Sequence, residues 1–172
     1  LIMLSGLQGT GKSTIASSLT TKLQYPLFAK DHLEAVLYND NLTDGSSLTS
    51  YHMMFELAQL HLSLGMSCIL DAVFPLVGFR NHVQDIAKSY QTQLYILHTY
   101  CSDQALHRQR ISMRLSTVPW QRITWNDTLQ TQSMYVEWSR EEALFLDAVN
   151  PLNEIFDISM TKRLGLVNAK IL

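Results

Sequence analysis

The segment GLQGTGKS, residues 6–13, fits the pattern G-x-x-x-x-G-K-[ST] and directly follows the apolar run Leu1 to Leu4. This order predicts a strand, a tight glycine-rich loop and a helix that begins at the end of the loop. Several backbone N–H groups and the positive end of the helix dipole then point at one place, where a phosphate can bind. The fold therefore has to bring a strand end and a helix start together.

Side chains within the loop have separate predicted roles. Lys12 can reach the β- and γ-phosphates of a nucleotide and is also assigned as catalytic, and the Ser13 hydroxyl can ligate Mg²⁺. The glycines let the backbone curl without a Cβ clash. We therefore predict a nucleoside triphosphate and Mg²⁺ as cofactors. The loop alone does not distinguish ATP from GTP. We assign ATP because no [NT]-K-x-D guanine signature follows. The loop residues expected to bind nucleotide are Gly6, Gln8, Gly9, Thr10, Gly11, Lys12, Ser13 and Thr14.

The composition favours one domain over residues 1–172, because 47% of 172 residues are hydrophobic and two ordinary domains would need a longer chain. The net charge of −2 gives no general attraction to nucleic acid or anionic membranes. Cys68 and Cys101 lie in apolar runs, which is typical of reduced thiols in a cytosolic protein. No apolar run is long enough to span a membrane, and no signal-peptide pattern is found. The expected first strand already starts at Leu1, so the sequence leaves open whether a short segment precedes it. We expect a cytoplasmic monomer or homodimer.

Apolar runs that suit buried strands alternate with amphipathic helical patterns along the chain. The expected strands are 1–4, 26–30, 66–70, 94–98 and 143–146, and the expected helices are 13–23, 31–38, 51–64, 77–90, one from 102, 128–138 and one from 150. This alternation predicts a three-layer α/β fold with a five-stranded parallel sheet and helices on both faces. The strand that ends at Asp71 should neighbour the first strand. Residues 39–65 should shape the acceptor side, and 110–126 a short lid.

Two carboxylates follow expected strands. Asp31 comes after the second strand, at the sheet edge where ligands bind in open α/β sheets, so it is a candidate for acting on an acceptor hydroxyl. The alternative is that Asp31 caps the helix 31–38, and the residues alone leave both interpretations open. Asp71 follows the third strand and is expected to help hold Mg²⁺. Ala72 comes next, where nucleotide-driven motors usually have Glu, which favours transfer to an acceptor.

A basic helix follows the fourth strand. Arg110 and Arg114 are four residues apart on one face and would repel each other without an anion between them, which suits a lid over phosphates. A solvated basic face is the alternative. Arg80 lies in the first turn of the helix 77–90, where a cation is unfavourable against the dipole, so a ligand or solvent is expected to use it. Trp120 and Trp125 could anchor the core or form a substrate wall.

The chain resembles the small phosphate-loop kinases grouped with polynucleotide kinase, chloramphenicol phosphotransferase and gluconate kinase. The resemblance covers most of the chain, and the first of its motifs is the most specific. The motifs are GLQGTGKST at 6–14, Asp31 after the second strand, ILDAVF at 69–74 with Arg80 beyond it, the pair Arg110 and Arg114, and ALFLDAVNPL at 143–152.

The resemblance implies a role for each matched position. Asp31 would be the general base or orienting carboxylate for the acceptor hydroxyl. Arg110 or Arg114 would neutralise charge on the transferred phosphoryl group, with the other near the nucleotide. The loop 148–151, with Asn150, would lie beside the adenine.

One position departs from the family pattern. The residue three after the catalytic Asp is often Arg, which in polynucleotide kinases holds a phosphate of the acceptor, whereas here it is Glu34. An acidic side chain would repel a phosphate, which argues against a nucleic-acid acceptor. We assign Asp31, Glu34 and Arg80 to the acceptor side.

Three functional hypotheses follow. The first is an ATP- and Mg²⁺-dependent kinase that phosphorylates a hydroxyl of a small-molecule acceptor. The second is a nucleotide-binding switch or slow ATPase without an acceptor. The third is a polynucleotide 5′-hydroxyl kinase, against which Glu34 and the low net charge stand.

Overall fold

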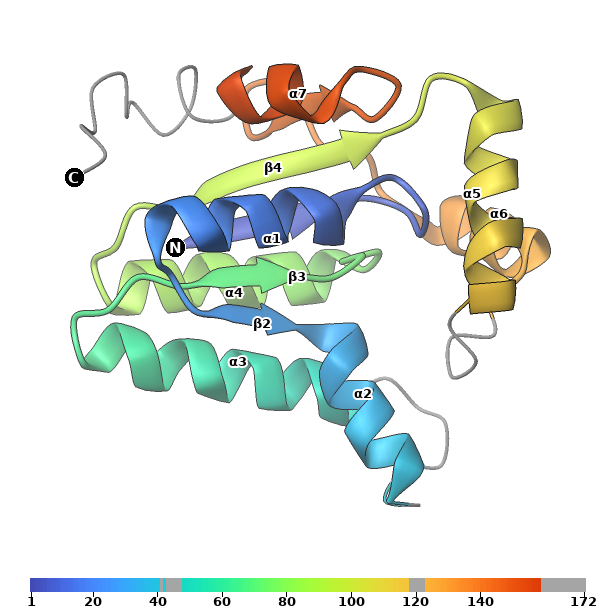
Figure 1. The fold of residues 1–172 in the computed structure, drawn as a ribbon. Coiled ribbons are helices and arrows are strands. Elements are labelled where there is room, and N and C mark those ends of the chain that lie inside the picture. Colours follow the sequence, from blue (N-terminus) through green and yellow to red (C-terminus); the bar gives the residue numbers. More distant parts are fainter. Residues whose placement is uncertain (41, 43–47, 118–122, 159–172) are drawn as a thin grey trace.

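The computed structural model describes residues 1–40, 42, 48–117 and 123–158. Over this part of the chain five parallel strands form one sheet in the order β2-β3-β1-β4-β5 (Figure 1). The strands are β1 (Ile2–Ser5), β2 (Leu27–Ala29), β3 (Ile69–Asp71), β4 (Tyr95–Tyr100) and β5 (Leu144–Asp147). The helices are α1 (Lys12–Leu23), α2 (Lys30–Asn39), α3 (Leu48–Ser63), α4 (Val77–Ser89), α5 (Gln104–Thr117), α6 (Trp125–Met134) and α7 (Leu152–Ile158). The expected α/β fold, with β1 next to β3, is confirmed.

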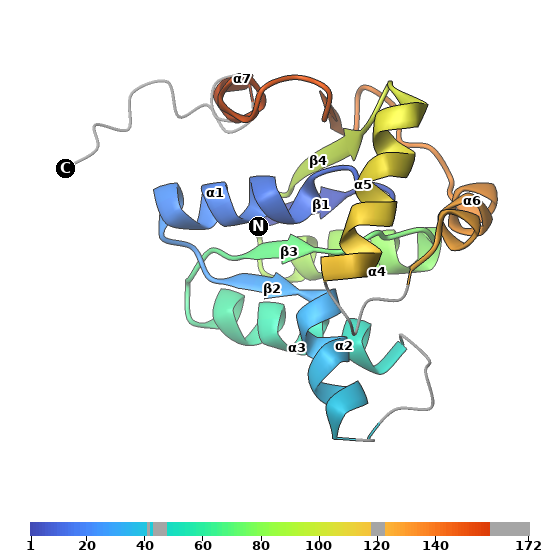
Figure 2. The same cartoon turned by 45° about the vertical axis from the view of Figure 1, so that its right-hand side comes forward.

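Helices cover both faces of the sheet because its central strands are apolar on both sides. On β1, Ile2 and Leu4 pack with residues of α1 and α7, whereas Met3 packs with residues of α3 and α4. All three side chains are at most 2% exposed. Figures 1 and 2 show the resulting layers, with α5 and α6 lying beyond the carboxyl ends of the strands.

The register brings the ends of three strands to one level. Asp71 of β3 pairs with Leu4 of β1 on one side and with Ala29 of β2 on the other. The phosphate-binding segment follows β1, and α2 begins immediately after Ala29. Three separate parts of the sequence therefore meet at the carboxyl edge of the sheet.

The expected helix 128–138 is wrong at both ends. The helix α6 starts at Trp125, because Thr124 and Asp127 form a capping box in which the Asp127 carboxylate accepts from the Thr124 N–H at 2.8 Å. It ends at Met134, and Tyr135 and Trp138 turn into the core instead.

The other helix boundaries differ less from the expected ones. The helix α3 begins at Leu48, inside the segment expected to be a loop. The expectation for Trp120 and any part of the last helix beyond residue 158 lie outside the described residues. Among the described helices, none is both long and apolar enough to cross a membrane.

Candidate active site

The phosphate loop is fixed from behind by β4. At Gly6 the backbone has φ +138°, and a Cβ there would lie 2.2 Å from the carbonyl oxygen of Thr99. The Thr10 hydroxyl also lies 2.7 Å from that of Thr99, and His107 Nε2 donates to the Gln8 carbonyl at 2.6 Å. Glycine is therefore required at position 6 by close packing as well as by backbone conformation.

Lys12 and Asp71 are two buried charged residues of the site. Lys12 is 8% exposed and its Nζ donates to the Leu7 carbonyl at 2.7 Å. Burial lowers the pKa of Lys12, and the nearby carboxylates of Asp71 and Asp31 oppose this. Burial likewise raises the pKa of Asp71, opposed by Lys12 and by a hydrogen bond from Ser13. The two side chains stabilise each other's charged form in a buried environment.

Asp31 lies in the first turn of α2 and does not cap the helix. The cap position is Ala29, which makes no side-chain cap bond, and α2 starts at Lys30. The Asp31 carboxylate instead meets α5, where Arg114 Nη2 lies 3.4 Å from its Oδ2. Capping, the alternative to a functional role, is therefore wrong.

The two arginines of the predicted lid have separate partners. Arg114 pairs with Asp31, and Arg110 donates from Nη2 to the carbonyl of Ala148 at 2.9 Å. Each arginine therefore has an acceptor of its own, and the repulsion expected without an anion between them stays a prediction. Both arginines line a cavity of about 500 Å³ with loop residues and Asn150. The other residues that line this cavity are Gly9, Gly11, Lys12, Ser13, Thr14, Ile15, Ala148, Leu152 and Ile155.

Glu34 is not an isolated negative charge. Lys30 Nζ lies 2.6 Å from Glu34 Oε2 and 3.7 Å from Asp31 Oδ1. With Arg114, two cations face two carboxylates on the predicted acceptor side. Lys30 offsets the charge of Glu34, and the repulsion of a phosphate by Glu34 stays a prediction.

Arg80 lies in the core, which corrects its assignment to the acceptor. It is 4% exposed, its Nε donates to the Phe74 carbonyl at 2.8 Å, and its guanidinium lies 4.5 and 4.3 Å from the ring centroids of Tyr135 and Trp138. A cation in the first turn of α4 is accommodated by aromatic faces and a carbonyl.

Two residues beside Asp31 were missed in the sequence. Lys30 could have been found, because Lys30 and Glu34 are four apart on a helix and opposite charges at this spacing pair. No comparable sequence pattern identifies Tyr51. Its hydroxyl accepts from the Phe74 N–H at 3.1 Å, burial raises the pKa of the phenol, and Lys30 lies 5.8 Å from its ring centroid.

The donor set fits a nucleotide with Mg²⁺. The cavity combines the loop, the start of α1 and two guanidinium groups, which is the chemistry a polyphosphate requires. The Ser13 hydroxyl helps to lower the pKa of Asp71, and these two side chains would hold Mg²⁺. Two protein oxygens suffice for Mg²⁺, which keeps several waters and binds the substrate phosphates.

Comparison with known proteins agrees with this geometry. The model of the AAA_33 family, described as an AAA domain, matches residues 1–132, and the chain belongs to this family. A search of curated proteins found no match.

Several solved structures share the fold at low identity. Kti12 from Chaetomium thermophilum, in complex with ADP-AlF3, has a TM-score of 0.71 at 18% identity over 91% of this chain and 95% of that one. A gluconokinase from Sinorhizobium meliloti 1021 has 0.68 at 15% identity over 93% and 89%. The APS kinase CysC from Mycobacterium tuberculosis, in complex with AMPPNP and APS, has 0.67 at 16% identity over 93% and 94%.

Proposed function

We propose that this protein is an ATP- and Mg²⁺-dependent kinase that transfers the γ-phosphate to a hydroxyl of a small-molecule acceptor. The observation that carries the proposal is the contact of Asp31 with Arg114 at the carboxyl edge of the sheet. It joins a candidate base on the acceptor side to a cation that lines the cavity beside the phosphate loop. The kinase neighbours support this class of reaction, while the acceptor is not identified by them.

Each charged group has a step in the proposed reaction. The Asp31 carboxylate accepts the proton of the acceptor hydroxyl as its oxygen attacks the γ-phosphorus and the bond to ADP breaks. Lys12, Arg110 and Arg114 neutralise the charge that spreads over the phosphoryl oxygens. Ser13 and Asp71 would hold Mg²⁺, which supplies further neutralisation of the phosphates when bound.

The balanced charges on the acceptor side restrict the substrate. Lys30 pairs with Glu34, and Arg114 pairs with Asp31, so no net charge of this cluster attracts a strongly charged acceptor. A polar, uncharged hydroxyl compound therefore suits the cluster best. A polynucleotide, which carries one charge per nucleotide, is disfavoured by the same balance and by the net charge of −2.

The test is a screen for acceptor-dependent ADP release with sugars, nucleosides, antibiotics and oligonucleotides. Asp31→Asn should abolish the stimulation by an acceptor while ADP affinity, measured by calorimetry, stays within about threefold. Asp40→Asn, at the exposed end of the same helix, is the matched control and should keep full activity. Full acceptor-stimulated turnover in Asp31→Asn would contradict the proposal, and the absence of stimulation by every compound would favour a switch or slow ATPase.

A further inference from the structure

A second cavity lies behind the phosphate loop, separate from the one that the nucleotide is proposed to occupy. Its volume is about 460 Å³, within the range of small-molecule sites. The wall combines aromatic rings, including Trp125 and Phe145, with the polar side chains of His98, Glu137 and Arg140. We call it the rear cavity, and the proposed reaction uses none of these five residues.

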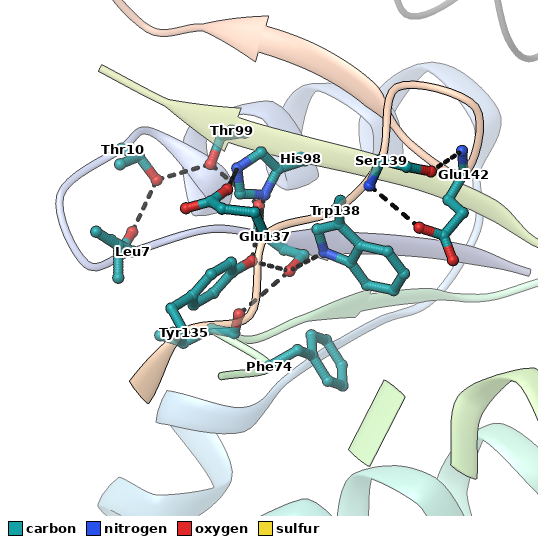
Figure 3. A network of polar contacts seen from close by, with 12 residues as sticks. Leu7, Thr10, Phe74, His98, Thr99, Tyr135, Glu137, Trp138, Ser139 and Glu142 are labelled. Carbon is teal, nitrogen blue, oxygen red and sulfur yellow. Dashed lines mark hydrogen bonds and ion pairs between the residues drawn. The ribbon is translucent and has the colours of Figure 1, made fainter. Parts of the chain in front are cut away.

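A chain of hydrogen bonds joins His98 through Tyr135 to Ser5. Ser5 Oγ donates to the Val73 carbonyl at 3.2 Å and accepts from Trp138 Nε1 at 3.0 Å. The Tyr135 hydroxyl lies 2.6 Å from Ser5 Oγ and 3.2 Å from His98 Nδ1 (Figure 3). These contacts hold the His98 ring in place at the wall of the rear cavity.

The neutral His98 ring and the Glu137 carboxylate face each other at the rear cavity. Burial lowers the pKa of His98 to about 4, helped by Arg80 and Lys12, so the ring is neutral and has one N–H. His98 Nε2 lies 3.9 Å from Glu137 Oε2, which is beyond hydrogen-bond distance, so the carboxylate can accept from an N–H group of a ligand.

The remaining charges set the class of ligand. Arg140 lies with its guanidinium 4.8 Å from the Phe145 ring centroid and balances the charge of Glu137. His98 contributes no charge, so these groups suit a ligand without net charge. The aromatic rings favour a flat ligand that stacks.

The back of the phosphate loop forms part of the same wall. Leu7 and Thr10 line the rear cavity, and the Thr10 hydroxyl donates to the Leu7 carbonyl at 2.7 Å. Lys12 Nζ donates to that same carbonyl. A ligand in the rear cavity would therefore contact the segment that positions Lys12.

We propose that the rear cavity is a second binding site for a small, neutral, planar heterocycle or amide with an N–H donor. Its amide or amino group donates to Glu137 beside the His98 ring, and its acceptor side meets Arg140. Occupancy changes nucleotide affinity through Leu7 and Thr10.

Nicotinamide is a suitable probe, because it is planar and neutral and carries an amide N–H₂. Methyl nicotinate is the matched control, since it keeps the ring and the carbonyl but has no N–H donor. Nuclear magnetic resonance of labelled protein follows the His98 ring and the Trp125 indole N–H during titration. Saturable binding of nicotinamide with a Kd of about 1 mM or tighter is expected, with methyl nicotinate at least about tenfold weaker. No binding, or equal binding of both compounds, would overturn the site.

Variants locate the site without depending on phosphotransfer. Glu137 is 73% exposed in its side chain, so Glu137→Ala should fold normally and bind nicotinamide about tenfold more weakly, whereas Glu137→Gln keeps an acceptor and loses less. Glu56→Ala, on the exposed side of α3, is the control and should bind as the wild type does. Unchanged binding by Glu137→Ala contradicts the site. Saturating nicotinamide should change the Kd for ADP severalfold, and an unchanged value would refute the link to the phosphate loop.

Discussion

Arg114 Nη2 lies 3.4 Å from Asp31 Oδ2, although the two residues are 83 positions apart in the chain. One residue belongs to α5 and the other to the first turn of α2. The contact bridges the two sides of the carboxyl edge of the sheet. It makes α5 the element that joins the start of α2 to the cavity beside the phosphate loop.

We expect Arg114→Gln to lower acceptor-dependent kcat by about 100-fold, because it removes a cation that stabilises the transferred phosphoryl group. The affinity for ADP should change much less. Steady-state kinetics and calorimetry measure the two effects. Arg108→Gln changes an exposed arginine on the same helix and serves as the control; an equal loss of kcat in that variant would refute a specific role for Arg114.

Replacement of Lys12 should act on the nucleotide. Lys12→Ala removes a buried ammonium from the loop, and a charge-assisted hydrogen bond is worth about 1.5–3 kcal/mol, so the Kd for ATP should rise more than about tenfold. Lys22→Ala, at the exposed end of α1, should leave the Kd unchanged. Fluorescence titration with a labelled ATP analogue measures both. Equal affinities of the two variants would contradict the assignment of Lys12.

Gly6→Ala should destabilise the fold by at least about 2 kcal/mol, because a Cβ would meet the backbone of Thr99 and the φ of +138° is strained for alanine. Gly78→Ala is the matched control, since Gly78 lies in α4 with no atom within 4 Å of a Cβ, and its stability should stay equal or rise. Urea unfolding gives both values. A Gly6→Ala variant as stable as Gly78→Ala would disprove the close packing.

Acid should destabilise the protein partly through His98. The unfolded chain binds this proton near pH 6.5, whereas the folded protein binds it only near pH 4, so the unfolded state holds more protons between these values. The stability contributed by neutral His98 is present above pH 6.5 and is lost on acidification, by about 3 kcal/mol at pH 4.

The variant His98→Gln isolates this contribution. The free energy of unfolding should depend less on pH between 6.5 and 4 in His98→Gln than in the wild type, as measured by urea titrations at several pH values. The control His52→Gln changes an exposed histidine and should keep the wild-type slope. A wild-type slope in His98→Gln would rule out this group as the source.

The sheet and the phosphate loop were predictable because their signals are local. The run before Gly6 is apolar and buried on both faces, and the spacing of the glycines and Lys12 identifies the loop on its own. The position of Asp31 at a strand end was also predictable. That it meets Arg114 was not, because no local pattern relates α2 to α5.

The errors have physical causes of the same kind. A first-turn arginine was expected to face a ligand or solvent, yet Arg80 is accommodated by Tyr135 and Trp138, which come from a distant segment. Those two aromatic residues were assigned to a helix because the helical pattern around Thr128 continues past its true end. Tertiary packing determines the conformation of these residues, and local sequence patterns do not predict such packing.

The contacts of Thr99 with the phosphate loop bear on how tightly a nucleotide can bind. Because Gly6 and Thr10 are held against β4 by folding itself, the loop has little conformational freedom left to lose when a phosphate arrives. The conformational entropy of the loop is then lost when the protein folds rather than when the nucleotide binds. Natural variation at Thr99 should accordingly change folding stability and nucleotide affinity together.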